Sequence, residues 1–177
     1  KAAGLGIASI EKDKERYEHK YEFCDLLVTG SGPAGLSSAY SAAKNGAKVI
    51  LAEDKPRFGG SLLTDDVTID NLSGKAWADK IIAELKEMAN VIIKNRSQVF
   101  GYYDHNMTVM FERTGDHLKN KPKYTPRQRL WYIRAKEVLL STGSIERPIV
   151  FGNNDTPGVF LSAAAKEYIK VYGVLVG

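Results

Sequence analysis

The stretch CDLLVTGSGPAGLSSAYSAAKNGAKVILAE, residues 24–53, decides the fold. Residues 25–29 form a short apolar run that ends at a glycine, which is typical of a buried parallel strand. Residues 33–45 are predicted to form a helix, because Pro33 suits a first helical turn and Gly46 suits a stop. Residues 47–53 then give a second buried strand. The stretch therefore predicts a strand–helix–strand unit with a parallel crossover.

Three glycines follow the first strand directly and open the helix in the spacing Gly-x-Gly-x-x-Gly. Gly30 permits a tight turn, Gly32 lets the backbone approach a pyrophosphate, and Gly35 lets the helix pack on the strand. The helix start offers free N–H groups and a positive dipole end to phosphates. The pattern predicts a dinucleotide site, and the alternative is a glycine turn that holds no ligand.

Glu53 ends the second strand, where a carboxylate can accept hydrogen bonds from the two hydroxyl groups of a ribose. The same carboxylate would repel a 2′-phosphate, so Glu53 argues against NADP. Lys55 and Arg57 weaken this argument against NADP, because either cation could meet a phosphate if the loop folded back.

Further along the chain the sequence predicts more elements of an α/β fold. Ser73 suits the N-cap of a helix over residues 74–89. The other predicted elements are a third parallel strand over residues 90–95, antiparallel strands over residues 98–104, 107–113 and 129–135, an apolar strand over residues 136–143, and a helix over residues 161–172. The fold class is therefore a Rossmann-like FAD/NAD(P)-binding domain with a parallel sheet and a three-stranded antiparallel insert.

The chain is expected to divide into a polar N-terminal arm, residues 1–20, and a dinucleotide-binding domain, residues 21–177. It starts with Lys and ends in YGVLVG, so both ends look cut. We therefore expect an incomplete fragment that lacks the second nucleotide-binding half of such a domain.

Composition narrows the function classes. The 177 residues hold no apolar run long enough to span a bilayer, and the net charge of +4 is small and scattered, which argues against nucleic acid as a partner. Cys24 is the only cysteine, so a disulfide framework, a Cys-x-x-Cys redox pair and a cysteine-rich metal site are excluded, and a reducing, cytoplasmic location is expected. The three histidines have no metal-site spacing, and no catalytic residue is predicted.

Two later segments separate this chain from other nucleotide folds. Gly59 and Gly60 would let a loop pass close to the pyrophosphate, and residues 141–143 would face the same crevice at the carboxyl edge of the sheet. Methyltransferases share the glycine turn and the terminal acid but do not require these segments. The arrangement looks like the two-dinucleotide-binding flavoprotein architecture, which can place FAD or NAD in its first site.

Several strings give a narrower resemblance. They are CDLLVTGSGPAGL (24–36), FGGSLL (58–63), VFGYYDHN (99–106) and PRQRLWYIRAKEVLLSTGSIERPIVFGNNDTPGV (126–159). From about residue 21 to residue 177 the chain resembles the α-subunit family of heterotetrameric sarcosine oxidases. Subunits of opine oxidases and of cyanide-forming dehydrogenases share part of the pattern and remain alternatives.

The resemblance implies that amine oxidation and NAD binding take place in different subunits. In that family the complex oxidises sarcosine to glycine and makes hydrogen peroxide with formaldehyde or, when folate is present, methylenetetrahydrofolate. Amine oxidation is assigned to the FAD of a β subunit, and FMN lies near the α–β contact, with γ and δ subunits completing the complex. The α subunit carries NAD in a domain like this one, so this fragment alone is expected to be inactive.

Candidate cofactor-binding residues share a place at the carboxyl edge of the predicted sheet. They are Gly30, Gly32, Pro33, Ala34, Gly35, Glu53, Asp54, Gly60, Ser61, Thr142 and Gly143. Three hypotheses stay open: an NAD-holding, non-catalytic portion of an oxidoreductase subunit; an FAD-binding domain of a related opine oxidase or NAD(P)H-dependent flavoprotein reductase; and a scaffold that serves as a subunit interface. His105 is expected to be a turn residue, with a role near a flavin or at a subunit contact as the alternative.

Overall fold

The computed structural model describes residues 6–176, and its centre is a six-stranded mixed sheet. The strands are β1 (Tyr17–Thr29), β2 (Val49–Ala52), β5 (Val91–Lys94), β6 (Ser97–Tyr103), β7 (Met107–Arg113) and β8 (Gln128–Leu140). Their order in the sheet is β5-β2-β1-β8-β7-β6, with the first four parallel and β7 and β6 added antiparallel. This is the Rossmann-like α/β fold with an antiparallel extension that the sequence predicts.

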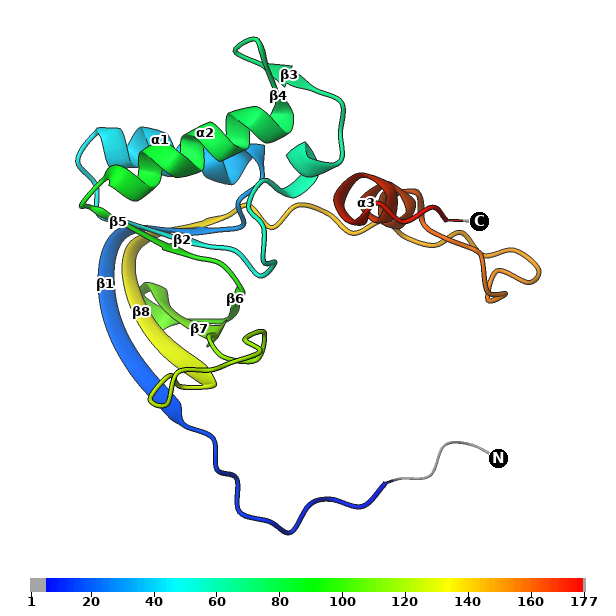
Figure 1. Cartoon of the computed structure of the whole chain (residues 1–177). Helices are drawn as coiled ribbons and strands as arrows, with labels where there is room; N and C mark the ends of the chain where they lie inside the picture. Colours follow the sequence, from blue (N-terminus) through cyan, green and yellow to red (C-terminus); the bar gives the residue numbers. More distant parts are fainter. Residues whose placement is uncertain (1–5, 177) are drawn as a thin grey trace.

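Two helices, α1 (Pro33–Lys44) and α2 (Gly74–Glu87), cover one face of the parallel strands (Figure 1). Their apolar stripes, including Leu36 and Leu85, pack on Val28 and Leu51 in a core whose members are almost fully buried. Ser73 begins α2 as predicted, because its hydroxyl oxygen accepts the N–H of Ala76 at 3.3 Å.

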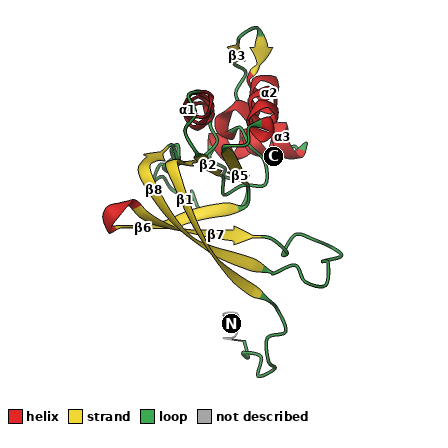
Figure 2. Ribbon diagram, turned by 90° about the vertical axis from the view of Figure 1, so that its left-hand side faces the viewer, coloured by secondary structure: helices red, strands yellow, loops and turns green. Residues whose placement is uncertain are grey.

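The opposite face of the parallel strands is covered by the antiparallel strands, which curl beneath it (Figures 1 and 2). Met110 and Ile133 lie there against Ile50 and Cys24 in a second buried cluster. The parallel strands are therefore apolar on both faces, which explains why their sequences read as continuous hydrophobic runs.

The predicted strands over residues 129–135 and 136–143 are wrong as two elements, because β8 is a single strand of 13 residues. No glycine or proline interrupts the sequence at the proposed boundary. Ala135 is buried there, and β8 pairs with β1 along its whole length. Its first half also pairs with β7, so the same strand belongs to both the parallel and the antiparallel parts of the sheet.

The boundary of the predicted arm, residues 1–20, also needs correction. Residues 1–5 lie outside the described residues, and Tyr17–Lys20 belong to β1, where they pair with Gln128–Trp131 of β8. Long-range pairing therefore extends β1 further than its local polar sequence suggests.

The segment between β2 and α2 carries elements that the sequence pattern did not reveal. A short 3-10 helix, η1, spans Gly60–Leu63, and a small hairpin joins β3 (Thr68–Ile69) to β4 (Leu72–Ser73). Asp70 and Asn71 form its two-residue turn with positive φ angles of 51° and 63°, a conformation that Asp and Asn tolerate well.

The C-terminal helix α3 spans Ser162–Tyr172, close to the prediction. Glu146 caps its start, because its carboxylate accepts the hydroxyl of Ser162 at 2.6 Å and the N–H of Ala163 at 2.8 Å. Within residues 6–176, none of the helices has both the length and the apolar character that crossing a membrane requires.

Candidate functional site

The corner between β1 and α1 is closed so tightly that only glycine fits at two positions. Gly30 has a φ of +98°, and a Cβ there would lie 2.4 Å from the carbonyl oxygen of Ser141. A Cβ on Gly35 would lie 1.9 Å from the carbonyl oxygen of Gly30. Gly35 therefore serves the close approach of helix to strand that the motif predicts, and Gly30 makes the tight turn and leaves room for the end of β8.

The third glycine of the motif faces open space. A Cβ on Gly32 would meet no atom within 4 Å in the described part of the chain, and Gly32 is the N-cap of α1 without a side-chain cap. Pro33 occupies the first helical position, and the N–H groups of Ala34 and Gly35 precede the first intrahelical bonds. The corner thus presents backbone donors and a helix dipole end, which suit an anionic phosphate.

Glu53 follows β2 and is buried, with only 6% of its surface exposed. Its Oε2 accepts the N–H of Ser31 at 2.9 Å and the hydroxyl of Ser31 at 2.5 Å. Its Oε1 accepts the N–H of Lys55 at 3.0 Å. The carboxylate is therefore directed toward the glycine corner, with lone pairs beyond those used by these three donors.

Burial raises the pKa of the Glu53 carboxyl above its ordinary value, and the neighbouring Asp54 carboxyl acts in the same direction. The hydrogen bonds from Ser31 and Lys55 oppose this rise by stabilising the charged form. Asp54 itself is exposed, and its carbonyl oxygen accepts a hydrogen bond from Arg113 at 2.9 Å.

The second glycine segment lies against the first. The N–H of Gly59 donates to the carbonyl and hydroxyl oxygens of Ser31 at 3.1 and 3.2 Å. Gly60 has a φ of +53°, and a Cβ on it would lie 2.9 Å from the Cα of Gly32. Ser61 is exposed one position further along, at the start of η1. The two loops therefore form one wall of the corner.

The end of β8 forms the opposite wall of the corner between β1 and α1. The hydroxyl of Ser141 donates to the carbonyl oxygens of Thr29 and Gly30 at 2.8 and 3.0 Å. Thr142 and Gly143 follow it and are exposed, with Gly143 in the left-handed region at a φ of +71°. The Oγ1 of Thr29 is buried without a hydrogen-bond partner among the described residues, so a polar atom remains unpaired at this corner.

The structure thus brings the predicted residues together at the carboxyl ends of β1, β2 and β8. Asp54, Ser61, Thr142 and Gly143 lie at the exposed rim of this cradle rather than at its centre. Sequence reasoning missed Ser31, which bonds both Glu53 and Gly59. The sequence signal that could have indicated it is a hydroxyl residue between Gly30 and Gly32, in a turn that lies beside the end of the strand that Glu53 follows.

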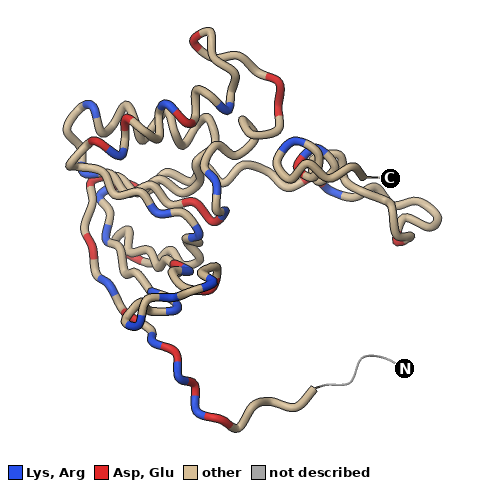
Figure 3. Tube along the Cα trace, in the orientation of Figure 1, with Lys and Arg blue, Asp and Glu red and all other residues tan. Residues whose placement is uncertain are grey.

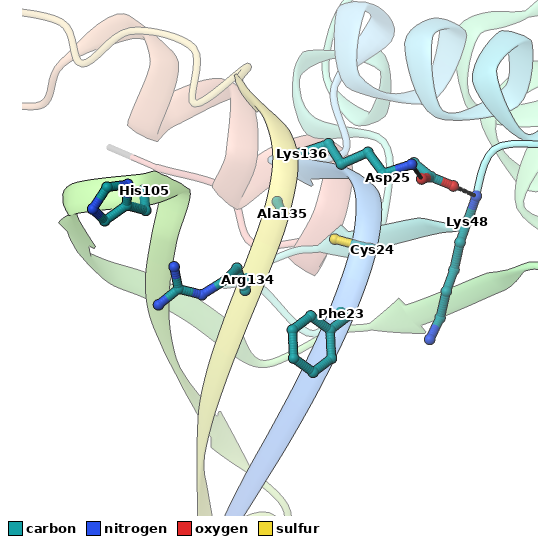
Figure 4. A pocket seen from close by; sticks show the side chains of 8 residues that line it. All are labelled: Phe23, Cys24, Asp25, Lys48, His105, Arg134, Ala135 and Lys136. Atoms are coloured by element: carbon teal, nitrogen blue, oxygen red, sulfur yellow. Dashed lines mark hydrogen bonds and ion pairs between the residues drawn. The ribbon is translucent and has the colours of Figure 1, made fainter.

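A separate pocket of about 420 Å³ lies beside the middle of β1 and β8, next to the start of β2 (Figure 4). Cys24, Arg134 and His105 line it, and an ion pair joins Asp25 to Lys136 at 2.7 Å. His105 has a φ of 58° in the short helix η2 (Asp104–Asn106), consistent with the turn role expected of it. Within residues 6–176 no cluster of three His, Cys, Asp or Glu side chains could hold a metal ion.

The cradle fits an adenine dinucleotide in three respects. Open space at Gly32 lies beside unpaired helix-start donors, the buried Glu53 carboxylate is directed toward it, and a second glycine loop lies against it. Such a corner on a parallel sheet is characteristic of Rossmann-like oxidoreductase domains. The chain belongs to the FAD dependent oxidoreductase family, whose model matches residues 25–120.

Curated relatives show which members of this oxidoreductase family the chain is similar to. The chain is 45% identical over its whole length to the α subunit of sarcosine oxidase from Rhizobium meliloti strain 1021, of which it spans 18%. It is 28% identical over 87% of its length to an opine oxidase subunit from Agrobacterium tumefaciens strain Ach5, of which it spans 30%. The predicted resemblance to sarcosine oxidase α subunits is confirmed, and the chain spans less than a fifth of such a relative.

A solved structure supports the fold. L-proline dehydrogenase from P. horikoshii matches 94% of this chain and 31% of its own chain, with a TM-score of 0.70 and 25% sequence identity. The similarity extends to almost the whole of the described sheet and its helices.

Proposed function

We propose that this chain is the dinucleotide-binding portion of the α subunit of a sarcosine oxidase-type complex, with NAD held in the cradle. One observation carries the proposal: the buried Glu53 carboxylate is held toward the glycine corner by the N–H and hydroxyl of Ser31. That position suits the two hydroxyl groups of an unphosphorylated adenosine ribose.

In this proposal each candidate residue has a distinct role. The N–H groups around Gly32, Ala34 and Gly35 bind the pyrophosphate, and Glu53 accepts hydrogen bonds from the ribose. Gly60 keeps the second loop close, Pro33 fixes the first turn of α1, and the rim residues border the bound molecule. They are Asp54, Ser61, Thr142 and Gly143. In this proposal the portion holds NAD and carries out no chemical step itself.

The amine oxidation is proposed to occur in another subunit. Sarcosine, oxygen and water would yield glycine, formaldehyde and hydrogen peroxide there. With tetrahydrofolate in place of water as the reactant, methylenetetrahydrofolate would form in place of formaldehyde. A binding role for this portion is supported by the use of both Glu53 oxygens in holding its loops. Cys24 lies in the interior of β1, away from the carboxyl end that borders the cradle, and burial raises the pKa of its thiol to about 11. We propose a cytoplasmic hetero-oligomer with β, γ and δ subunits, in which this portion alone is inactive.

FAD in the same cradle is the second candidate, because the matching family is named for FAD. The adenosine halves of FAD and NAD are alike, so Glu53 suits either. An opine oxidase-type subunit with FAD in this position fits the same geometry.

The experiment compares cofactor content in the full-length complex with and without an obstructed cradle. Gly32→Val places a branched side chain in the open space, and Gly152→Val is the matched control, because a Cβ there also meets no atom within 4 Å in the described chain. Each complex is denatured, and the released small molecules are identified by mass spectrometry and by flavin absorbance.

Loss of NAD from Gly32→Val alone, with the flavins retained, supports NAD in the cradle. Loss of FAD with NAD retained supports the second candidate instead. Unchanged content of every dinucleotide in Gly32→Val contradicts a binding role and favours an interface scaffold.

A further inference from the structure

Two cationic residues, Lys55 and Arg57, follow Glu53 in the loop that a ribose 2′-phosphate would approach under the proposed function. The N–H of Lys55 donates to Glu53 Oε1 at 3.0 Å, so the Lys55 backbone is attached to the proposed ribose-binding carboxylate. Arg57 follows two positions later in the same loop. In dinucleotide-binding folds, a nearby cation accommodates the 2′-phosphate of NADP. Judged by these two side chains alone, the cradle should tolerate NADP.

Helix α3 binds both cations. Lys55 Nζ lies 2.9 and 3.0 Å from the two carboxylate oxygens of Glu167, which is a bidentate ion pair. Arg57 donates to the carbonyl oxygen of Val171 at 2.8 Å, and its guanidinium carbon lies 5.9 Å from the centre of the Tyr172 ring. The hydrogen bond to Glu167 raises the pKa of Lys55, so its charge persists but is neutralised locally.

Further ion pairs hold α3 beside Lys55 and Arg57. Lys166 and Lys170 pair with Asp65 and Asp66, which follow η1, at 3.2 and 2.9 Å. Figure 3 shows charges of both signs on α3, and no side chain of α3 is buried in the described part of the chain. The position of the helix therefore depends on ion pairs rather than on a shared apolar core.

We propose that Glu167 is a specificity-determining residue, which keeps Lys55 away from the ribose and so makes the cradle reject 2′-phosphorylated nucleotides. This inference rests on the proposed role of Glu53 in binding the adenosine ribose. A 2′-phosphate would approach two carboxylates, Glu53 and Glu167, while the nearest cation is already paired. Removing the charge of Glu167 removes one repulsion and frees Lys55 for a charge-assisted hydrogen bond.

The test measures nucleotide binding by calorimetry in the full-length protein stripped of bound nucleotide. The probes are AMP and adenosine 2′,5′-bisphosphate, which differ only in the 2′-phosphate and represent the adenosine half shared by NAD, NADP and FAD. Wild type is expected to bind AMP more tightly than the bisphosphate. In Glu167→Gln the affinity for the bisphosphate should rise about fivefold to tenfold, while that for AMP changes less than about twofold.

Asp66→Asn is the matched control. It removes one negative charge, as Glu167→Gln does, and it breaks another contact of α3, but it leaves Lys55 paired with Glu167. Its preference for AMP should equal that of wild type. The double variant Lys55→Gln/Glu167→Gln should lose the gain, because the freed cation is gone.

Equal gains in Asp66→Asn and Glu167→Gln would overturn the inference, because net charge alone would explain them. An unchanged preference in Glu167→Gln, in a variant whose circular dichroism matches wild type, would overturn it as well. If wild type binds neither probe, the proposed function fails along with the inference. AMP binding without any effect of Glu167→Gln overturns the inference alone.

Discussion

Ser31 and Glu53, 22 positions apart in the sequence, form the contact that joins the first glycine loop to the end of β2. The Ser31 hydroxyl lies 2.5 Å from Glu53 Oε2, and both residues are buried. The same hydroxyl oxygen accepts the N–H of Gly59, so one small side chain links three segments of the cradle.

Ser31→Ala should destabilise the chain and weaken nucleotide binding together. Glu53 would remain buried with one fewer donor, and a lost buried hydrogen bond to a carboxylate lowers the free energy of unfolding by about 1–3 kcal/mol. Urea unfolding measures that loss, with Ser37→Ala as the control, because Ser37 is exposed on α1. Equal stability of the two variants would contradict the linking role of Ser31.

The motif glycines should separate into two classes by stability. Gly35→Ala forces a Cβ to 1.9 Å from the Gly30 carbonyl oxygen, and such overpacking lowers the free energy of unfolding by about 3 kcal/mol or more. Gly32→Ala should cost about 1 kcal/mol or less, since open space surrounds that position in the described chain and its φ of −68° is allowed to alanine. Thermal unfolding of the two variants measures the difference, and similar melting temperatures would refute it.

Glu53 should make stability fall as pH rises. Its pKa is raised in the folded chain, so its contribution is fully present below the ordinary carboxyl value of 4.5 and is lost as pH passes through the raised value. Glu53→Gln removes this contribution. The difference in unfolding free energy between wild type and Glu53→Gln should therefore shift against wild type from acid to neutral pH. Denaturant titrations at several pH values measure it, and a difference that does not change with pH would contradict the burial effect.

Cys24 should react slowly with thiol reagents in the folded chain. It is 5% exposed, and burial raises the pKa of its thiol to about 11. Its thiolate population near pH 8 is then about two orders of magnitude below that of an ordinary thiol with a pKa of about 8.5. Alkylation followed by peptide mapping at Cys24, with and without denaturant, measures the protection. A native rate equal to the denatured rate would exclude it.

The strand–helix–strand unit and the glycine corner could be predicted because their signals are contiguous. Residues 25–53 carry the apolar runs, the glycines and the acid that together specify a parallel crossover. Local sequence therefore identified which residues would gather at the carboxyl edge of the sheet, as β1, β2 and α1 place them.

The remaining features depend on partners distant in the sequence. The continuity of β8 and the early start of β1 follow from their mutual pairing, which joins Tyr17 to Gln128. The contact between Ser31 and Glu53 depends on how β2 ends beside β1. The pairing of Lys55 with Glu167 spans 112 positions, so no local pattern could indicate it.

The outer half of β1 also covers an edge of β8 that could otherwise pair with other molecules. Residues 17–24 pair only with β8 among the described strands, and their sequence YEHKYEFC places Glu18, Lys20 and Glu22 along that free margin. Its neighbour in the sheet is the segment QRLWYIRA of β8, which is richer in apolar side chains. A shortened chain that begins after residue 24 would expose this apolar part of β8 and its unpaired backbone amides. Such an exposed strand edge promotes self-association.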